Sequence, residues 1–512
     1  MSLVDNDLLS IQEARILLER VEESKEVLEG FPAELVGDFL AKVSETLLPK
    51  CDAYAAMAYC ESDYCTAEDE AALTKWVLEE LYPEVSAQVP VQEIYGCVSD
   101  TSAKMCLSKG VVLSFVPDWL AVPTMLSQIA CAIRSKSPIV FSVRPRVHAT
   151  CAQVMDDLLE VAEACHYPAE ALGFLSHYSP EGEQWLAEQD GVRMLIDSRD
   201  YEHLTPKNTL GKDVYYASVG NNPVFVEATA DLAHCAKEVV SSASFACGML
   251  PGAEQSVVVE ESVSDALKVE LGKRGCRFLT EEESSRLIKV MFAPDGHPFR
   301  ELIGKSATDL ARRADIVVSD STRVLAVEKP YVSERSLYSG VKYGPVISYY
   351  VEENWRGACE KCIELILGNG HGNALAIFSR DPEVVRQFIL KKPVGRILVN
   401  TSTGLGSIGR HSNLPKTLTI AGWDFATTSD AGVTYQDFVR RRRIGIGESN
   451  EDRSLLLAAG MRGPCGHADD ESAKDVEPKA AAIKQEAANG GDGRTGGLDG
   501  WFSSLLESVR EN

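Results

Sequence analysis

Strand-like apolar runs alternate with helix-like stretches through most of this chain, and this alternation limits its fold more than any other feature. Strand-like runs occupy residues 110–117, 138–143 and 191–197, and helix-like stretches lie between them at 123–135 and 151–165. Strands separated by helices of this length form βαβ units, whose strands pair in parallel. The pattern therefore predicts an α/β fold built on a parallel sheet.

A second α/β region follows the first. Apolar spacing predicts a helix at 262–275, and short apolar runs predict buried strands at 374–379 and 395–400. The opening of the chain is helical instead, with apolar residues at helical spacing over 6–30 and Gly30 as a stop signal. A chain of 512 residues is also too long for one compact core. We therefore predict at least two domains.

Charge and composition exclude several classes of function. The formal net charge of −25 argues against non-specific binding to nucleic acid or to an anionic membrane, because both partners are polyanions. No apolar run is long enough to span a bilayer, and the first 13 residues lack the pattern of a secretory signal. Fourteen cysteines without such a signal indicate reduced thiols in a cytoplasm.

Cys359 and Cys362 form a CxxC pair inside the helix-like stretch 355–367. A redox or metal role is one interpretation of this pair. One pair cannot complete a four-ligand zinc site, and small apolar cysteines often pack on a helix face. No metal site is therefore predicted.

The end of the chain differs from the rest. Residues 448–496 are rich in Gly, Ala, Asp and Glu, which predicts a flexible linker. Residues 497–512 then place six apolar residues on one helix face, namely Leu498, Trp501, Phe502, Leu505, Leu506 and Val509. A helix this short needs a partner, which is either the same chain or another protein bound in a groove.

Seven segments resemble the CoA-acylating acetaldehyde dehydrogenases of the aldehyde dehydrogenase superfamily, in family order and at family spacing. They are DLLSIQEAR (7–15), SFACGMLPGAEQSVVVE (244–260), FLTEEE (278–283), GKSATDLA (304–311), GNGHGNALAIFSRD (368–381), GRILVNTSTGLGSIGR (395–410) and LPKTLTIAG (414–422). The resemblance implies oxidation of an aldehyde with NAD and transfer of the acyl group to CoA, or the reverse.

The resemblance also assigns the domains. It implies N-terminal helices and a Rossmann-type nucleotide-binding domain at 1–240, a catalytic-type domain at 241–420 and an oligomerisation arm at 421–447. The linker at 448–496 and the amphipathic tail helix at 497–512 complete the chain.

The family's chemistry needs a cysteine thiolate that attacks the carbonyl carbon. The family pattern SFDNG, two residues, Cys aligns without a gap and places Pro251 at the nucleophile position. Proline has no nucleophile and no N–H to help bind an oxyanion. Cys247, four residues earlier, is the fallback nucleophile if the loop is rebuilt; the alternative is a buried structural thiol.

Other positions of the family site are also changed. Leu120 stands where the family has an oxyanion-binding asparagine, and Val341 stands where it has a glutamate. Arg199 and Asp200 replace the two cofactor glycines of a Thr-Gly-Gly motif, where their side chains would crowd and repel a pyrophosphate. His371 is interpreted as a turn residue.

A few residues of the family's cofactor-binding motifs remain, which are Ser142, Pro145, Gly220 and Asn221. Residues 440–443 are four arginines, and they resemble the basic run that ends microcompartment-packaged relatives. Two interpretations of this run remain open, a contact with a CoA phosphate and a solvated charged stretch.

These losses predict a catalytically degenerate family member that acts as a partner or scaffold subunit. It would form homo-oligomers, or mixed oligomers with an intact paralogue, and its tail would dock to a shell or cargo protein of a bacterial microcompartment. Two alternatives remain open, an active enzyme that uses Cys247 and a CoA-binding module without turnover.

Overall fold

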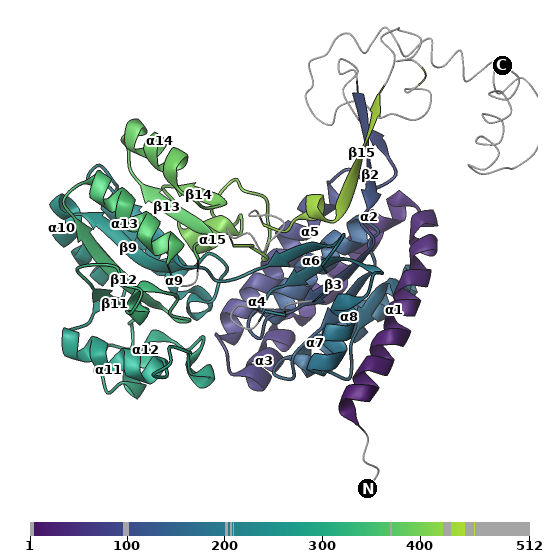
Figure 1. The fold of residues 1–512 in the computed structure, drawn as a ribbon, viewed down its shortest axis with the longest axis horizontal. Helices are drawn as coiled ribbons and strands as arrows, with labels where there is room; N and C mark the ends of the chain where they lie inside the picture. Colours follow the sequence, from purple (N-terminus) through teal and green to yellow (C-terminus); the bar gives the residue numbers. More distant parts are fainter. Residues whose placement is uncertain are drawn as a thin grey trace, which may run out of the picture. The chain divides into compact units, whose positions relative to one another are not determined.

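The computed structural model describes residues 5–95, 102–199, 203–204, 207, 209–368, 371–422, 432–445 and 455. The chain divides into two compact units. The first comprises residues 1–91 and 107–440, and the second comprises residues 92–106 and 441–512. Both large sheets lie in the first unit (Figure 1).

The first unit opens with helices. Asp5 caps the first helix by accepting hydrogen bonds from the N–H groups of Asp7 and Leu8, and the helix then buries one apolar stripe. These helices are α1 (Asn6–Gly30), α2 (Ala33–Leu47), α3 (Cys51–Ser62), α4 (Ala67–Trp76) and α5 (Tyr82–Ser86). The helix predicted at 6–30 is confirmed as α1.

A five-stranded parallel sheet follows, in the order β5-β4-β3-β6-β7. Its strands are β3 (Val111–Phe115), β4 (Ile139–Ser142), β5 (Leu172–Phe174), β6 (Val192–Asp197) and β7 (Asp213–Tyr216). Its helices are α6 (Ala121–Arg134), α7 (His148–Ala164) and α8 (Pro180–Glu188). Every residue of α6 is buried. The predicted βαβ alternation is therefore confirmed.

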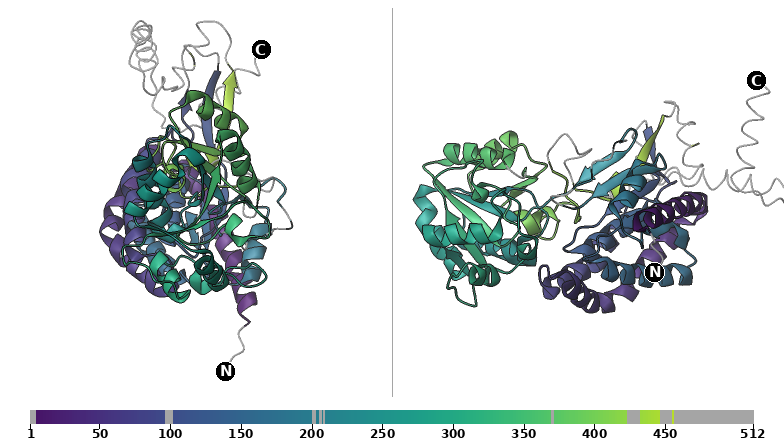
Figure 2. Two further views of the ribbon diagram at one scale, coloured as in Figure 1. Left: turned by 90° about the vertical axis from the view of Figure 1, so that its left-hand side faces the viewer. Right: turned by 60° about the horizontal axis from the view of Figure 1, so that its bottom comes forward.

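A seven-stranded parallel sheet holds the rest of the first unit, in the order β10-β11-β12-β9-β8-β13-β14. Its strands are β8 (Asn222–Val226), β9 (Glu254–Glu260), β10 (Cys276–Phe278), β11 (Val324–Glu328), β12 (Val346–Glu352), β13 (Ala374–Phe378) and β14 (Arg396–Val399). Its helices are α9 (Leu232–Ser244), α10 (Glu261–Lys273), α11 (Glu281–Met291), α12 (Ala307–Arg313), α13 (Trp355–Leu367), α14 (Pro382–Lys391) and α15 (Thr403–Ser407). Figure 2 shows the purple-to-blue helices around the first sheet and the teal-to-green helices around the second.

Short helical turns connect these elements. They are η1 (Leu48–Lys50), the π-helical η2 (Val77–Leu81), η3 (Ala169–Ala171), η4 (Phe245–Gly248), η5 (Arg300–Leu302), η6 (Leu337–Ser339) and η7 (Tyr435–Asp437).

The chain passes from the first large sheet to the second before residue 240, where the resemblance places a domain boundary. Strand β8 pairs with β9 and β13, so the second sheet already begins at Asn222. Helix α9 packs on this same sheet. The last strand of the first sheet ends at Tyr216, and the first strand of the second begins at Asn222.

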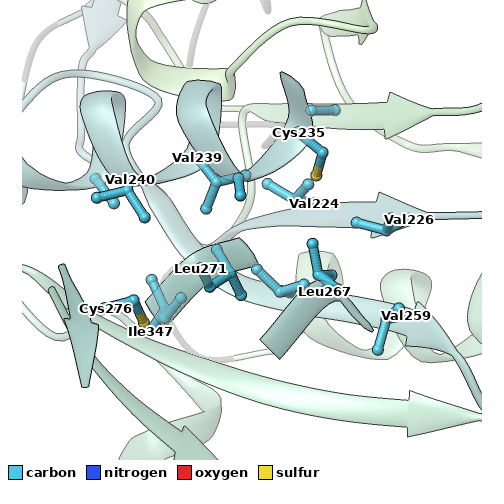
Figure 3. Close-up of a cluster of buried hydrophobic side chains, with 14 of the residues drawn as sticks. Val224, Val226, Cys235, Val239, Val240, Val259, Leu267, Leu271, Cys276 and Ile347 are labelled. Carbon is cyan, nitrogen blue, oxygen red and sulfur yellow. The ribbon is translucent and has the colours of Figure 1, made fainter. Parts of the chain in front are cut away.

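Helices cover both faces of the seven-stranded sheet. Val224 and Val226 of β8 point to a core that includes Val239 of α9 and Leu267 of α10 (Figure 3). Phe225, between the two valines, points to the opposite face and packs with α13 and α14. Alternate residues of one strand thus serve two apolar cores, as a parallel sheet covered on both sides requires.

Most residues of a three-stranded sheet, in the order β1-β2-β15, belong to the second unit. Its strands are β1 (Ile94–Tyr95), β2 (Ser102–Ser108) and β15 (Val439–Gly445). The four arginines 440–443 lie on β15 and are all exposed. Strand β15 lies within 421–447, the range that the resemblance assigns to an oligomerisation arm.

The tail helix predicted at 497–512 and all of the linker except residue 455 lie outside the described residues. Within the described part, no helix combines the length and apolar character that a membrane crossing needs.

Candidate functional site

The segment that carries Pro251 connects α9 to β9. It begins with η4, in which Ala246 and Cys247 adopt left-handed backbone conformations, at φ 48° and 52°. It ends with Gly252, at φ 83°, whose N–H donates to the carbonyl oxygen of Val219. These left-handed residues and this hydrogen bond fix the position of Pro251, which lines a cavity.

Leu120 lies at the N-cap of α6 and lines the same cavity. Its backbone is left-handed, at φ 52° and ψ 36°, and its side chain is 2% exposed. Asparagine is one of the few residues that adopt this conformation readily, whereas leucine is strained there by about 1 kcal/mol or more. The backbone at this position thus suits an asparagine, the residue that the resemblance places there.

The cavity is small and mainly apolar. It is lined by Pro117, Trp119, Leu120, Thr124, Ser198, Ala217, Ser218, Val219, Met249, Pro251 and Leu418, and its free volume is about 20 Å³. About 10–15 Å³ suffices for one water molecule, and ligand pockets usually measure about 300–1,000 Å³. The space between Leu120 and Pro251 therefore holds a water molecule but not a nicotinamide ring beside an aldehyde.

Cys247 is not among the residues that line this cavity. Its side chain is buried beside charged residues of α4 and α12, and burial raises the pKa of its thiol to about 12, with the Asp69 and Asp309 carboxylates adding to the rise. At pH 7 only about one thiol in 10⁵ would be ionised. The described geometry gives this residue no activated thiolate.

A buried ion cluster occupies the carboxyl edge of the five-stranded sheet. The Arg199 guanidinium donates to Asp197 Oδ1 and Oδ2, at 2.9 and 2.8 Å, and to Glu183 Oε2 at 2.8 Å. Ser142 Oγ donates to the other Glu183 oxygen at 2.9 Å, and the guanidinium carbon lies 4.3 Å from the centre of the Phe115 ring. All five side chains are buried.

The pKa values in this cluster follow from its contacts. Burial alone would raise the pKa of Asp197, but the hydrogen bonds from Arg199 and the nearby His203 ring hold it well below its usual range. Burial raises the pKa of Glu183, which Arg199 only partly offsets. The guanidinium is thus already paired, and the local charge does not favour a further anion.

Open α/β sheets bind ligands at their carboxyl edge, where Phe115, Ser142 and Asp197 end their strands. Because side chains of the chain itself occupy this edge, the described residues do not fit the pyrophosphate of a dinucleotide. Asp200, predicted to repel that group, lies outside the described residues.

The other predicted cofactor residues have structural contacts. Gly220 is left-handed, at φ 77°. The fully buried Asn221 donates from its amide to the carbonyl oxygens of Ser339 and Leu365, at 2.8 and 2.7 Å. Pro145 is exposed in the turn before α7. Ser142 is the one retained residue that reaches the carboxyl edge, and its hydroxyl binds Glu183.

Comparisons with known proteins agree with this architecture. No family model matches the chain. The bifunctional aldehyde-alcohol dehydrogenase AdhE of Escherichia coli K12 is 24% identical over 407 residues, which cover 78% of this chain. The chain spans about half of that relative's length, since the match covers 45% of it.

Two solved structures superpose over almost their whole length. A probable aldehyde dehydrogenase from Listeria monocytogenes EGD-e has a TM-score of 0.82 and 26% identity, over 88% of this chain and 100% of its own. An acetylating aldehyde dehydrogenase from Geobacillus thermoglucosidasius has a TM-score of 0.82 and 23% identity, over 88% and 99%. The chain is a homologue of the acetylating aldehyde dehydrogenases. The fold class and the resemblance predicted from the sequence are thereby confirmed.

The cavity brings together positions that the family resemblance singled out. The structure brings Leu120, Pro251 and Ser198 to one cavity. Val341 is not among the residues lining this cavity; it lines a separate depression with Phe292 and Tyr343. Leu120, Pro251 and Ser198, the residue before Arg199, therefore line one cavity, whereas Val341 does not.

Two buried groups of this homologue were not singled out in the sequence. Burial raises the pKa of Glu254 to about 7, although the N–H groups of Thr403 and Gly404 donate to one of its oxygens. Burial also lowers the pKa of Lys342 to about 7, and its Nζ donates to the carbonyl oxygen of Gln255. Glu254 lies in the segment 244–260 that carries the family resemblance, and Lys342 directly follows Val341, a position compared with the family; this proximity was the available signal.

The remaining predicted position, His371, is not among the residues that line the cavity. His371 is exposed, and its backbone carbonyl accepts from the Asn221 N–H, which agrees with its interpretation as a turn residue. Among the described residues, no group of three His, Cys, Asp or Glu side chains could hold a metal ion.

Proposed function

We propose that this chain is a non-catalytic member of the acetylating aldehyde dehydrogenase family that serves as a partner or scaffold subunit. The observation that carries the proposal is the cavity between Leu120 and Pro251. Neither side chain can attack a carbonyl or donate to an oxyanion, and the space between them holds about one water molecule.

The nucleotide edge supports the same proposal. Arg199, Asp197 and Glu183 satisfy one another there, so a dinucleotide would have to displace a buried ion cluster. The resemblance implies NAD and CoA as cofactors. We propose that this chain has either lost the ability to bind them or binds them without turnover.

The decisive test is NADH formation by the purified chain with acetaldehyde, NAD and CoA. The acetylating enzyme from Geobacillus serves as the positive control, and Cys247→Ala is assayed in parallel. We expect no turnover from either form of this chain. Turnover that Cys247→Ala abolishes would refute the proposal and establish an active enzyme with a relocated nucleophile.

Ligand titration separates a silent scaffold from a CoA-binding module. Calorimetry with NAD and with CoA, each alone, is expected to show no binding of NAD. Binding of CoA without NAD would favour the binding module instead.

The partner role is tested by mixing the chain with an intact acetylating paralogue and measuring the mass of the oligomers. Separate oligomers of each chain would count against mixed assembly.

A further inference from the structure

A buried lysine contacts the first cysteine of the CxxC pair. Lys392 follows the last residue of α14, and its Nζ lies 2.7 Å from Cys359 Sγ and 2.8 Å from the Cys359 carbonyl oxygen, both in α13. The two residues are 7% and 5% exposed. They therefore meet inside the apolar layer that covers one face of the seven-stranded sheet.

The surroundings of Lys392 are unusual for an amine. The Phe388 ring centre lies 4.2 Å from Nζ, and Cys359 belongs to an apolar cluster with Phe225, Leu365 and Val394. Among the described residues, the hydrogen bonds of Lys392 Nζ go to the carbonyl oxygen and the sulfur of Cys359 rather than to a carboxylate. A buried amine without a carboxylate is costly, so its contact with sulfur is one of few interactions that hold it.

The nitrogen–sulfur separation is short. A typical N–H···O hydrogen bond measures about 2.9–3.0 Å, and sulfur is a larger atom than oxygen. The observed 2.7 Å is shorter than the hydrogen bond expected for the smaller acceptor. It matches the distance between two atoms that are both bonded to one bridging oxygen.

Cys362 is a poorer partner for Cys359. The two residues are separated by one helical turn, where β-carbons lie about 5–6 Å apart, whereas a disulfide needs about 3.5–4.5 Å. Burial also raises the pKa of the Cys362 thiol to about 12. A disulfide within this CxxC pair would therefore require α13 to distort.

We propose that Cys359 and Lys392 form an oxidation site at which peroxide joins sulfur to nitrogen through one oxygen. In the first step the Cys359 thiol and hydrogen peroxide give a sulfenic acid and water. In the second step the sulfenic acid, the Lys392 amine and another hydrogen peroxide give the S–O–N bridge and two waters. Sulfur and nitrogen each lose two electrons, and each peroxide accepts two.

The bridge would connect two elements of one layer. It would tie the middle of α13 to the end of α14, so both helices would be fixed to each other beside the sheet. Hydrogen peroxide is close to water in size and can reach a nearly buried sulfur. Excess thiol would reverse the bridge, because four thiols reduce it to a cysteine thiol, a lysine amine and water, forming two disulfides.

Peptide mapping of the full chain after peroxide treatment tests the proposal. Trypsin cuts after Arg356, Lys361, Lys391 and Arg396, which places Cys359 in residues 357–361, Cys362 in the next peptide and Lys392 in residues 392–396. The bridge would join peptides 357–361 and 392–396 with a mass gain of about 14 Da, one oxygen less two hydrogens. Dithiothreitol should remove this species.

Matched variants complete the experiment. Cys359→Ser and Lys392→Met should lose the cross-linked species, whereas Cys362→Ser and Lys391→Arg, an exposed neighbour whose substitution preserves the tryptic cut, should keep it. A thermal midpoint that rises with peroxide in the unsubstituted chain, but not in Lys392→Met, is also expected. Peroxide that yields only a Cys359–Cys362 disulfide, or no link to peptide 392–396 in the unsubstituted chain, would overturn the proposal.

Discussion

Two carboxylates hold the Arg199 guanidinium in a buried position at the end of β6. Replacing Arg199 with Ala would leave Asp197 and Glu183 without their counter-ion, and such a loss typically costs about 3–5 kcal/mol. We expect a decrease of this size in the free energy of unfolding, measured by urea denaturation. Arg193→Ala, an exposed position of the same strand, should change it by less than about 0.5 kcal/mol.

Glu254 provides a pH-dependent test at the same scale. Burial raises its folded-state pKa from 4.5 to about 7, so the folded chain binds the proton more tightly than the unfolded chain does. The proton's contribution to stability is therefore full below pH 4.5 and is lost as pH rises through 7. This loss is on the order of 3 kcal/mol.

Glu254→Gln removes this titration and keeps an oxygen for the N–H groups of Thr403 and Gly404. The thermal midpoint of the unsubstituted chain should fall relative to that of Glu254→Gln between pH 5 and pH 8. Comparing the two chains cancels the titration of other groups, such as Lys342. Parallel curves over this range would show that Glu254 does not hold its proton in the folded chain.

At the scale of elements, the loop between α9 and β9 depends on one close approach. Gly248 is left-handed, at φ 75°, and a β-carbon there would lie 2.6 Å from the carbonyl oxygen of Gly344. We expect Gly248→Ala to lower the free energy of unfolding by about 2–4 kcal/mol, from backbone strain and overlap together.

Gly272 is the matched control, because it lies in helix α10 and a β-carbon there would meet nothing within 4 Å. Gly272→Ala should stabilise the chain by about 0.5–1 kcal/mol. Equal effects of the two substitutions in chemical denaturation would mean that the loop can move away from Gly344.

Local patterns predicted the elements well where the periodicity was long. Apolar spacing located α1, and the helix-like stretch 355–367 coincides with α13. Strand β8 was not predicted, because it is short and contains Pro223, a residue that lowers the expectation of a strand. The order of the seven strands depends on pairings between segments that are distant in the sequence. Apolar periodicity within one segment cannot predict such pairings.

The candidate site was predictable only in part, for the same reason. Motif positions identified Leu120 and Pro251, and the structure shows that both line one cavity. The pairing of Arg199 with Glu183 and the contact of Lys392 with Cys359 each join segments that lie apart in the sequence. No local pattern indicates such pairs, so only the folded chain reveals them.

The whole chain combines a folded body with a C-terminal extension predicted to bind a partner. Both large sheets end before Arg440, and β15 ends at Gly445. We therefore expect a chain that stops at residue 447 to unfold within about 2 °C of the full chain, because the described apolar cores are all retained.

The same truncation should abolish binding to a partner, although it should leave the thermal stability almost unchanged. The apolar face of residues 497–512 would bury itself in a groove of a shell or cargo protein, so its removal should abolish co-sedimentation with assembled shells. Leu505→Glu and Leu506→Glu in the full chain test the same face without removing the linker, and Ser503→Glu on the polar side is the matched control. A full chain that never co-sediments, or a truncated chain that still does, would rule out the tail as the docking element and leave mixed oligomerisation as the remaining route to a partner.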